Sequence, residues 1–471
     1  MKKADLVKPN RLFLLHRMRF CGMIKGKTKR EVVMKSTTRF GGKLWFTAIL
    51  FGLVGQIAWV VENMYFATLS QDIFANSGRQ DLAYIVTTLM VIFSAVTATV
   101  TTILAGGFCD RVGKRKPFVA YGYMAWGVTI MAFACIPMRA EGNAVFVVAA
   151  LLVVFDCLMT LCGSTANDAA FNAWVADVTT PQNRGRVNGV LSVLPVFAVI
   201  IIFIGLGSLY SAENSNNALF FLVLGAIPLL AGVLALFLFR DGDHVQKSTG
   251  ERYWQDIFYG FRPSVVRANR MMYVCLAGAC LVGISQQTFF SYLMNFVIRT
   301  LGYGDGFVIP VAVIIVGAAL ITGLCGFLSD KFGRKHFYLP LLLTVILGTL
   351  SMYLLQFLEG GAVDVLLYIG GVLMMGAILS LTGALNAAFQ DYIPSGCEGR
   401  FQGVRMCFTV LIPMIVGPII SMCIGLDAMG MNGADFAPTY TIFLAAAIVA
   451  VPAALPLLSL RRDADRLRAE K

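Results

Sequence analysis

Three acidic residues lie inside long apolar stretches of this 471-residue chain, where a charged side chain is costly. Glu62 is in the first stretch, and Asp156 and Asp168 are in the fourth. In a low-dielectric setting a carboxyl group favours its neutral form and can carry a proton. It can equally hold a cation such as Na⁺ together with neighbouring hydroxyls and amides. We therefore predict that these three residues bind a coupling ion.

Amide and hydroxyl side chains recur in the same stretches at the spacing of one α-helical face, close to aromatic rings. The predicted substrate-binding residues are Gln56, Trp59, Asn63 and Tyr65 in the first stretch, Asn167 and Asn172 in the fourth, Gln286, Gln287 and Asn295 in the seventh, and Asn386 in the tenth. Amides beside aromatic rings suit a neutral polyol or glycoside. The alternative is that these side chains hydrogen-bond between helices and only hold the bundle together.

No lysine or arginine lies near the middle of any apolar stretch. An anionic solute, such as a sugar phosphate or a dicarboxylate, would therefore lack an obvious counter-charge inside the membrane. A neutral sugar or glycoside fits the residue types first, a cationic or amphipathic compound second, and an organic anion third.

Composition indicates which elements must position these residues. The chain is 58% hydrophobic and 14% charged, whereas a soluble domain carries about 25% charged residues. Apolar stretches of about 20 residues, long enough to cross a bilayer as helices, follow one another. We predict an all-α membrane protein with twelve transmembrane helices at residues 44–68, 82–106, 117–137, 144–170, 186–209, 218–239, 272–298, 306–328, 338–358, 363–388, 403–426 and 438–460.

The predicted helices divide into two sets of six with a polar segment between them. The parts are a basic N-terminal segment (1–43), a first bundle (44–239), a cytoplasmic central loop (240–270), a second bundle (271–460) and a cytoplasmic tail (461–471). The N-terminal segment is either an amphipathic arm on the membrane surface or lies before a natural start at Met34.

The basic residues are strongly biased toward one side of this layout. With an even number of helices, one side holds 35 of the 38 lysines and arginines, and the other side holds only Arg79, Arg139 and Arg299. Because cytoplasmic loops carry the excess of basic residues, both termini are predicted to be cytoplasmic. The net charge of +12 then reflects membrane topology and anionic lipid rather than nucleic-acid binding.

One short loop occurs twice, once in each half of the chain. The pattern D-R/K-x-G-R/K-R/K stands at 110–115, after the second predicted helix, and again at 330–335, after the eighth. A second pair of segments, around Asp177 and Asp391, repeats with a constant offset of 214 residues. A repeat of this kind indicates two halves of the same architecture.

On these motifs the chain resembles the major facilitator superfamily, whose G-x-x-x-D-R-x-G-R/K-R/K loop follows its second helix and returns, weaker, after its eighth. The segments 259–264 and 175–178 are similar to those of glycoside-pentoside-hexuronide cation symporters and their sucrose-transporter-like relatives. Residues 82–106 lack the acidic side chains that melibiose-type symporters carry in their second helix. The resemblance implies two pseudo-symmetric bundles that open to one side of the membrane at a time.

The repeated loops are predicted to form a cytoplasmic gate between the bundles. The resemblance directs Asp110 toward the start of the eleventh helix, and the repeat then predicts that Asp330 lies toward the fifth. We expect Arg111 and Lys114 to pair with Asp177, and Arg334 to pair with Asp391. The remaining predicted gate residues are Gly106, Gly113, Arg186, Gly333 and Arg400. The alternative is that these charges only enforce topology.

The sequence contains no P-loop, metal-ligand cluster or nucleophile–base pair, so we predict no enzyme activity. The first hypothesis is a secondary active transporter that imports a neutral sugar or glycoside with a cation or proton. Proton-coupled efflux of amphipathic or cationic compounds is the alternative, and a non-transporting membrane sensor or lipid-handling protein ranks third. We expect a functional monomer in the plasma membrane, with a small-molecule substrate, the lipid bilayer as partner, no nucleic acid, no bound metal and no cofactor besides coupling H⁺ or Na⁺.

Overall fold

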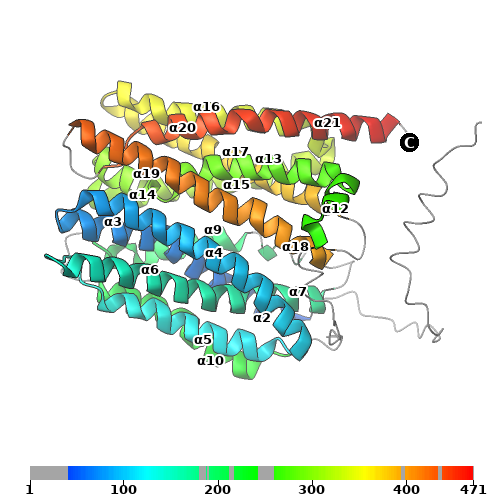
Figure 1. Cartoon of the computed structure of the whole chain (residues 1–471), viewed down its shortest axis with the longest axis horizontal. Helices are drawn as coiled ribbons and strands as arrows, with labels where there is room; N and C mark the ends of the chain where they lie inside the picture. Colours follow the sequence, from blue (N-terminus) through cyan, green and yellow to red (C-terminus); the bar gives the residue numbers. More distant parts are fainter. Residues whose placement is uncertain are drawn as a thin grey trace, which may run out of the picture. The chain divides into compact units, whose positions relative to one another are not determined.

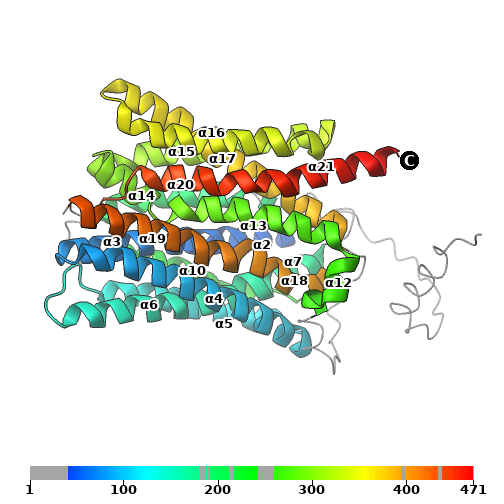
Figure 2. The same ribbon diagram turned by 45° about the horizontal axis from the view of Figure 1, so that its top comes forward.

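The computed structural model describes residues 41–179, 187, 190–191, 193–211, 217–241, 259–393, 398–432 and 437–469. For Asp110, Asp305, Asp330, 398–400, Gln402, 430–432 and 464–469 it describes the backbone alone. Residues 40–471 form one compact unit, in which long helices run side by side (Figures 1 and 2).

The first half of the chain is helical, with short irregular turns inside several helices. Its elements are α2 (Gly42–Val60), η1 (Val61–Phe66), α3 (Ala67–Asn76), α4 (Gln80–Val112), α5 (Lys116–Ala132), η2 (Phe133–Cys135), α6 (Ala144–Gly163), η3 (Ser164–Phe171), α7 (Asn172–Val178), α9 (Leu194–Ile200), η4 (Ile201–Leu206), η5 (Gly207–Leu209) and α10 (Ala218–Leu238).

The second half is also helical. Its elements are η6 (Tyr259–Phe261), α12 (Pro263–Ala268), α13 (Arg270–Phe290), α14 (Leu293–Asn295), η7 (Phe296–Thr300), η8 (Gly304–Phe307), α15 (Val308–Phe332), η9 (Arg334–His336), α16 (Tyr338–Leu354), η10 (Leu355–Phe357), α17 (Gly361–Tyr392), α18 (Glu398–Met406), η11 (Cys407–Leu411), α19 (Ile412–Asn432), α20 (Thr441–Ala450), η12 (Val451–Ala453) and α21 (Ala454–Ala469).

Eleven helical runs in the described residues are long and apolar enough to cross a membrane, and a shorter apolar run covers Leu194–Leu209. Helices fit this setting because they satisfy every backbone hydrogen bond within one segment. The prediction of an all-α, multi-pass membrane protein is confirmed. The shorter run corresponds to the predicted helix at 186–209, whose first residues lie largely outside the described part of the chain.

The first helical run is longer than predicted. It extends from Gly42 to Asn76 instead of ending at residue 68. Ser70, Gln71 and Asp72 are polar residues beyond residue 68, and all three are buried. Gln71 and Asp72 contact residues of distant segments, so the hydropathy of the first run alone could not place this end.

Glycines bring helices close together in both halves. A methyl group on Gly127 of α5 would lie 2.5 Å from the carbonyl oxygen of Gly225 in α10. A methyl group on Gly348 of α16 would lie 2.7 Å from the backbone of Met374 in α17. Small residues at such crossings allow the backbones to pack directly, which is the main source of helix association in lipid.

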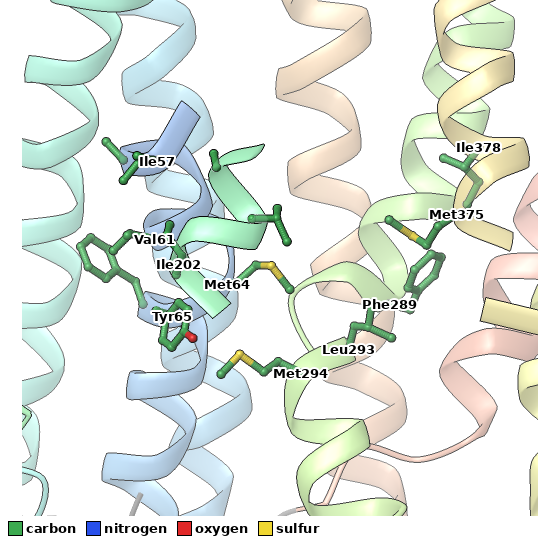
Figure 3. Packing of buried hydrophobic residues seen from close by; sticks show 14 of the residues in the cluster. Ile57, Val61, Met64, Tyr65, Ile202, Phe289, Leu293, Met294, Met375 and Ile378 are labelled. Atoms are coloured by element: carbon green, nitrogen blue, oxygen red, sulfur yellow. The ribbon is translucent and has the colours of Figure 1, made fainter. Parts of the chain in front are cut away.

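The two halves meet along several helices. The helix α4 packs against α19, and α9 and η4 pack against α15. In Figure 1 the helices of residues 42–238 occupy the lower part of the view and most of those after residue 263 the upper part. Figure 3 shows Met64 and Met294 extending toward each other from the two halves. The polar residues of the candidate site lie along this junction.

Candidate functional site

Glu62 lies in a π-helical turn, η1, inside the first helical run. Its Oε1 accepts a hydrogen bond from Ser94 Oγ at 2.5 Å and another from Thr160 Oγ1 at 2.9 Å. The two hydroxyl oxygens are themselves 3.0 Å apart. Three helical runs therefore meet at one carboxylate, which is 9% exposed. Single π turns inside α-helices occur frequently at functional sites.

Asp156 of α6 lines the same small cavity as Glu62, together with Thr87 of α4. The cavity measures about 20 Å³, room for about one water molecule or one small ion. Three buried oxygens at this site have no hydrogen-bond partner among the described residues: Glu62 Oε2, Asp156 Oδ1 and Thr87 Oγ1. An unpaired buried polar atom costs free energy, so three around one cavity favour a bound proton, water or cation.

The arrangement constrains the charge that the site can hold. Two carboxylates that share a buried site repel each other, so both cannot be charged without a compensating partner. A proton shared by the two carboxylates would remove one negative charge. A monovalent cation would instead compensate one negative charge, with the three unpaired oxygens as its ligands. Serine and threonine hydroxyls hold the Glu62 carboxylate in place in either state.

The structure brings some predicted substrate-binding residues to this cavity. Asn63 and Gln287 line it, and they come from opposite halves of the chain. Gln56, Trp59, Gln286 and Asn386 are half-buried in the same helical runs as predicted. The ring of Trp59 packs on that of Trp126 with centroids 5.0 Å apart.

Four other predicted substrate-binding residues have different surroundings. Tyr65 is fully buried among Phe203, Tyr210 and Phe220. Asn167 packs against Gly55 and accepts a hydrogen bond from Tyr123 at 3.3 Å. Asn172 is exposed, and Asn295 donates to Gln71 at 2.8 Å. A contact with solute by these four stays a prediction.

Asp168 lies in a second π-helical turn, η3, and does not line the cavity of Glu62. Ser164 donates a hydrogen bond to its Oδ2 at 3.2 Å. The positive charge of Arg405 in α18 also acts on it. Asp168 therefore has a cation of the opposite half in its surroundings, which differs from the setting of Asp156.

The loop residues form ion pairs within each half. Arg334 Nη1 lies 2.6 Å from Asp391 Oδ2, the pair expected from the repeat. Asp177 pairs instead with Arg115, with Nε–Oδ2 at 3.1 Å, while Arg111 and Lys114 are exposed. Gly113 has φ of +67° and Gly333 has φ of +92°, backbone conformations that favour glycine.

The gate role of the remaining predicted residues stays a prediction. The side chains of Asp110, Asp330 and Arg400, and all of Arg186, lie outside the described residues. A methyl group on Gly106 would meet nothing within 4 Å, so no close packing at this position requires a glycine. Asp241, not predicted, accepts hydrogen bonds from the backbone of Arg115 and Lys116 at 2.7 and 2.8 Å, at the start of α5.

Polar contacts join the two halves at the end opposite the repeated loops. Asp72 of α3 forms an ion pair with Arg299 of η7 at 2.7 Å and accepts a hydrogen bond from Tyr210 at 2.9 Å. Gln71 donates to the carbonyl oxygen of Ser291 at 3.1 Å. We call the pair Asp72–Arg299 the outer ion pair. The sequence prediction omitted it, because both residues fell outside the predicted helical segments.

A family model described as Major Facilitator Superfamily matches residues 44–418 of the chain. The glycine betaine/proline/ectoine/pipecolic acid transporter OusA of Dickeya dadantii (strain 3937) is 22% identical over 432 residues, covering 86% of this chain and 78% of that protein. A proline/betaine transporter of Escherichia coli (strain K12) is 20% identical over 395 residues, covering 78% of this chain and 72% of that protein.

Solved structures share the fold at low sequence identity. A D-xylose-proton symporter superposes with a TM-score of 0.68 at 15% identity, covering 88% of this chain and 96% of that one. The nucleoside transporter NupG superposes with a TM-score of 0.63 at 12% identity, covering 88% of this chain and 98% of that one.

Proposed function

Because this chain belongs to the major facilitator superfamily, we propose that it imports a small, net-neutral polar solute together with a proton or a sodium ion. It is a solute transporter and not an enzyme, so the proposal concerns the ion, the solute and the direction. Alternating access is the working principle: two six-helix bundles expose one central site to each side in turn.

The observation that carries ion coupling is the pair Glu62 and Asp156 with its three unpaired oxygens. Ionisable residues inside a membrane protein are costly and mark ion or proton pathways. The cavity also touches Gln287 and Ser291 of the second half. A proton or cation bound there alters the charge at the junction of the halves, which links ion binding to the opening of one side.

The solute class that we propose first is a neutral sugar or glycoside. Its support is the set of amides near the cavity, the ring of Trp59, and the sequence likeness to glycoside-pentoside-hexuronide cation symporters. Amides hydrogen-bond sugar hydroxyls, and an aromatic face packs on the ring. Asn63 and Gln287, one from each half, would contact the solute.

A small zwitterion with a quaternary ammonium group is the second candidate. The sequence relatives named above are betaine and proline transporters. A quaternary ammonium group is attracted to aromatic faces, and Trp59, three residues before Glu62 in the chain, packs on Trp126. Such a solute carries no net charge, which agrees with the absence of basic residues from the middle of the apolar stretches.

The proposed setting is the plasma membrane, with both termini in the cytoplasm and one chain as the functional unit. The charge distribution supports this orientation. The pairs Arg115–Asp177 and Arg334–Asp391 brace the repeated loops within each half. Asp110 and Asp330 complete the proposed cytoplasmic gate.

Uptake into vesicles tests the proposal. Purified protein is reconstituted, and a panel of glycosides, glycine betaine and proline is offered with a proton gradient, a sodium gradient or neither. We expect uptake of one class that requires one gradient. Glu62→Gln and Asp156→Asn should each abolish the gradient dependence, whereas Asp364→Asn, an acidic residue in the first turn of α17, should not. Gradient-independent uptake by the unmodified protein, or dye efflux with no solute uptake, would contradict the proposal.

A further inference from the structure

A second pocket lies at the membrane boundary, away from the transport site. It has a volume of about 500 Å³ and is formed where α2 begins and α10 ends. Its lining residues are Gly42, Lys43, Leu44, Phe46, Thr47, Trp174, Phe237, Leu238 and Arg240. The volume falls in the range of pockets that bind small molecules.

One wall of this boundary pocket is apolar and open to the surroundings. Phe46 is 57% exposed, Leu238 41% and Phe237 77%. All three lie in helical runs that are apolar enough to cross the membrane, so their exposed faces meet lipid. The wall therefore lies at the depth where acyl chains meet head groups.

The other wall carries two cations. Lys43 and Arg240 are both exposed, and neither has a carboxylate within ion-pair distance in the part of the chain that the structure describes. The neighbouring Asp241 is already engaged, since its Oδ1 accepts two backbone hydrogen bonds at the start of α5. Among the described residues, no acidic side chain lines the pocket.

Backbone hydrogen bonds fix both cationic residues at the rim of the pocket. Trp174 Nε1 donates to the carbonyl oxygen of Arg240 at 2.8 Å, and Thr47 Oγ1 donates to that of Lys43 at 2.9 Å. Trp174 is fully buried, so the Arg240 backbone is held against the core of the first half. The fold therefore sets the backbone positions from which the two cationic side chains extend.

From this geometry we propose that the boundary pocket binds an anionic glycerophospholipid. Its phosphate lies between Lys43 and Arg240, and an acyl chain follows the exposed rings of Phe46 and Phe237. Basic pockets between membrane helices on the cytoplasmic side recognise anionic head groups, and the charge distribution places this end of the helices in the cytoplasm. The lipid would join the first and sixth helices of one bundle.

Lipid titration of the purified full-length protein, read by native mass spectrometry, tests the site. Phosphatidylglycerol is compared with phosphatidylcholine for the unmodified protein, for Lys43→Gln with Arg240→Gln, and for Arg461→Gln with Arg462→Gln. The last pair removes two exposed charges from the corresponding end of the other half. We expect the first double variant to bind phosphatidylglycerol roughly 20-fold more weakly and the second to be unchanged.

Four results would overturn the proposal. Equal losses of phosphatidylglycerol affinity in both double variants would assign the effect to total charge. Unchanged affinity in both variants would show that the pocket does not bind the lipid. Displacement of phosphatidylglycerol by millimolar inorganic phosphate would show that the pocket takes a free anion. Tighter lipid binding after removal of residues 1–40 would show that this segment competes with lipid for the pocket. Because Lys43 and Arg240 are exposed, their substitution leaves the fold intact.

Discussion

Thr87 presents a buried hydroxyl oxygen to the cavity of Glu62 and Asp156, with no hydrogen-bond partner in the described residues. If this oxygen is a ligand of the coupling ion, Thr87→Val removes it while keeping the shape of the side chain. We expect the half-saturating concentration of the coupling ion to rise about tenfold, since a hydrogen bond or ligand contact to a charge contributes about 1.5 kcal/mol. The measurement is solute uptake against ion concentration.

Thr99 supplies the matched control for this prediction. It lies in the same helix, is 4% exposed, and also has a hydroxyl without a partner in the described residues, but it does not line the cavity. Thr99→Val should leave the ion dependence unchanged. An identical ion dependence in Thr87→Val and the unmodified protein would rule out Thr87 as a ligand.

The sequence alone singled out the acids Glu62 and Asp156 but not the hydroxyl groups around them. A carboxyl group inside an apolar stretch is recognisable from one helix, because its cost is intrinsic. Ser94 and Thr87 are ordinary helix residues whose importance depends on which helix they face. Their role follows from the packing of the second run against the first and fourth, which residue types alone do not encode.

The outer ion pair joins two helical elements, the first and the seventh helical runs, which belong to different halves of the chain. Asp72 is nearly inaccessible and Arg299 is about one quarter exposed. We therefore expect Asp72→Asn or Arg299→Gln to destabilise the conformation in which the two halves meet at this end by about 2 kcal/mol. The readout is the labelling rate of a cysteine at Ser291 by an impermeant maleimide added outside, in a cysteine-free background. Both variants should label faster.

The exchange variant Asp72→Arg with Arg299→Asp tests whether charge attraction is responsible. Its labelling rate should fall part of the way back to that of the unmodified protein, because the ion pair is restored with the two charges exchanged. Tyr210 would then lose its acceptor, so recovery is incomplete. If the exchange variant is labelled as fast as the single variants, the contact depends on the shape of the two side chains and not on their charges.

The two halves pack closely at Gly425 of α19. A methyl group there would lie 2.1 Å from Tyr84 Cε1, and the Tyr84 hydroxyl donates to the carbonyl oxygen of Ala437 at 3.1 Å. Gly425→Ala should therefore separate α19 from α4 and speed labelling at Ser291, with an overpacking cost of about 1–3 kcal/mol. Gly323→Ala is the control, since a methyl group there meets nothing within 4 Å. Slow labelling in Gly425→Ala would contradict this reading.

The loops show how far the repeat could predict contacts between elements. It identified Arg334 and Asp391 correctly as partners, but in the first half it selected Arg111 and Lys114 for Asp177. The helix α4 continues through Arg111 to Val112, which leaves Arg111 on an exposed face. After Gly113 the chain reverses, and this brings Arg115 to Asp177. The conformation of one glycine decides which basic residue makes the contact.

For the whole molecule, helix number and fold class could be predicted because apolar length and charge placement are properties of the entire chain. The extent of the first run could not, since the hydrogen-bond partners of Asp72 and Gln71 lie more than 100 residues away in the chain. The same distinction applies to function. Ion coupling is suggested by residue types, whereas the solute depends on side chains from two halves that meet only after folding.

The orientation of the whole molecule in the membrane gives the last prediction. The side that carries 35 of 38 lysines and arginines should face the cytoplasm. Cysteines at Glu141 and Lys331, both exposed and on opposite sides, are compared in a cysteine-free background. An impermeant maleimide added to intact cells should label Glu141→Cys at once and Lys331→Cys only after permeabilisation. The reverse pattern would invert the proposed gate, because the repeated loops would then lie outside and the outer ion pair would close the cytoplasmic end.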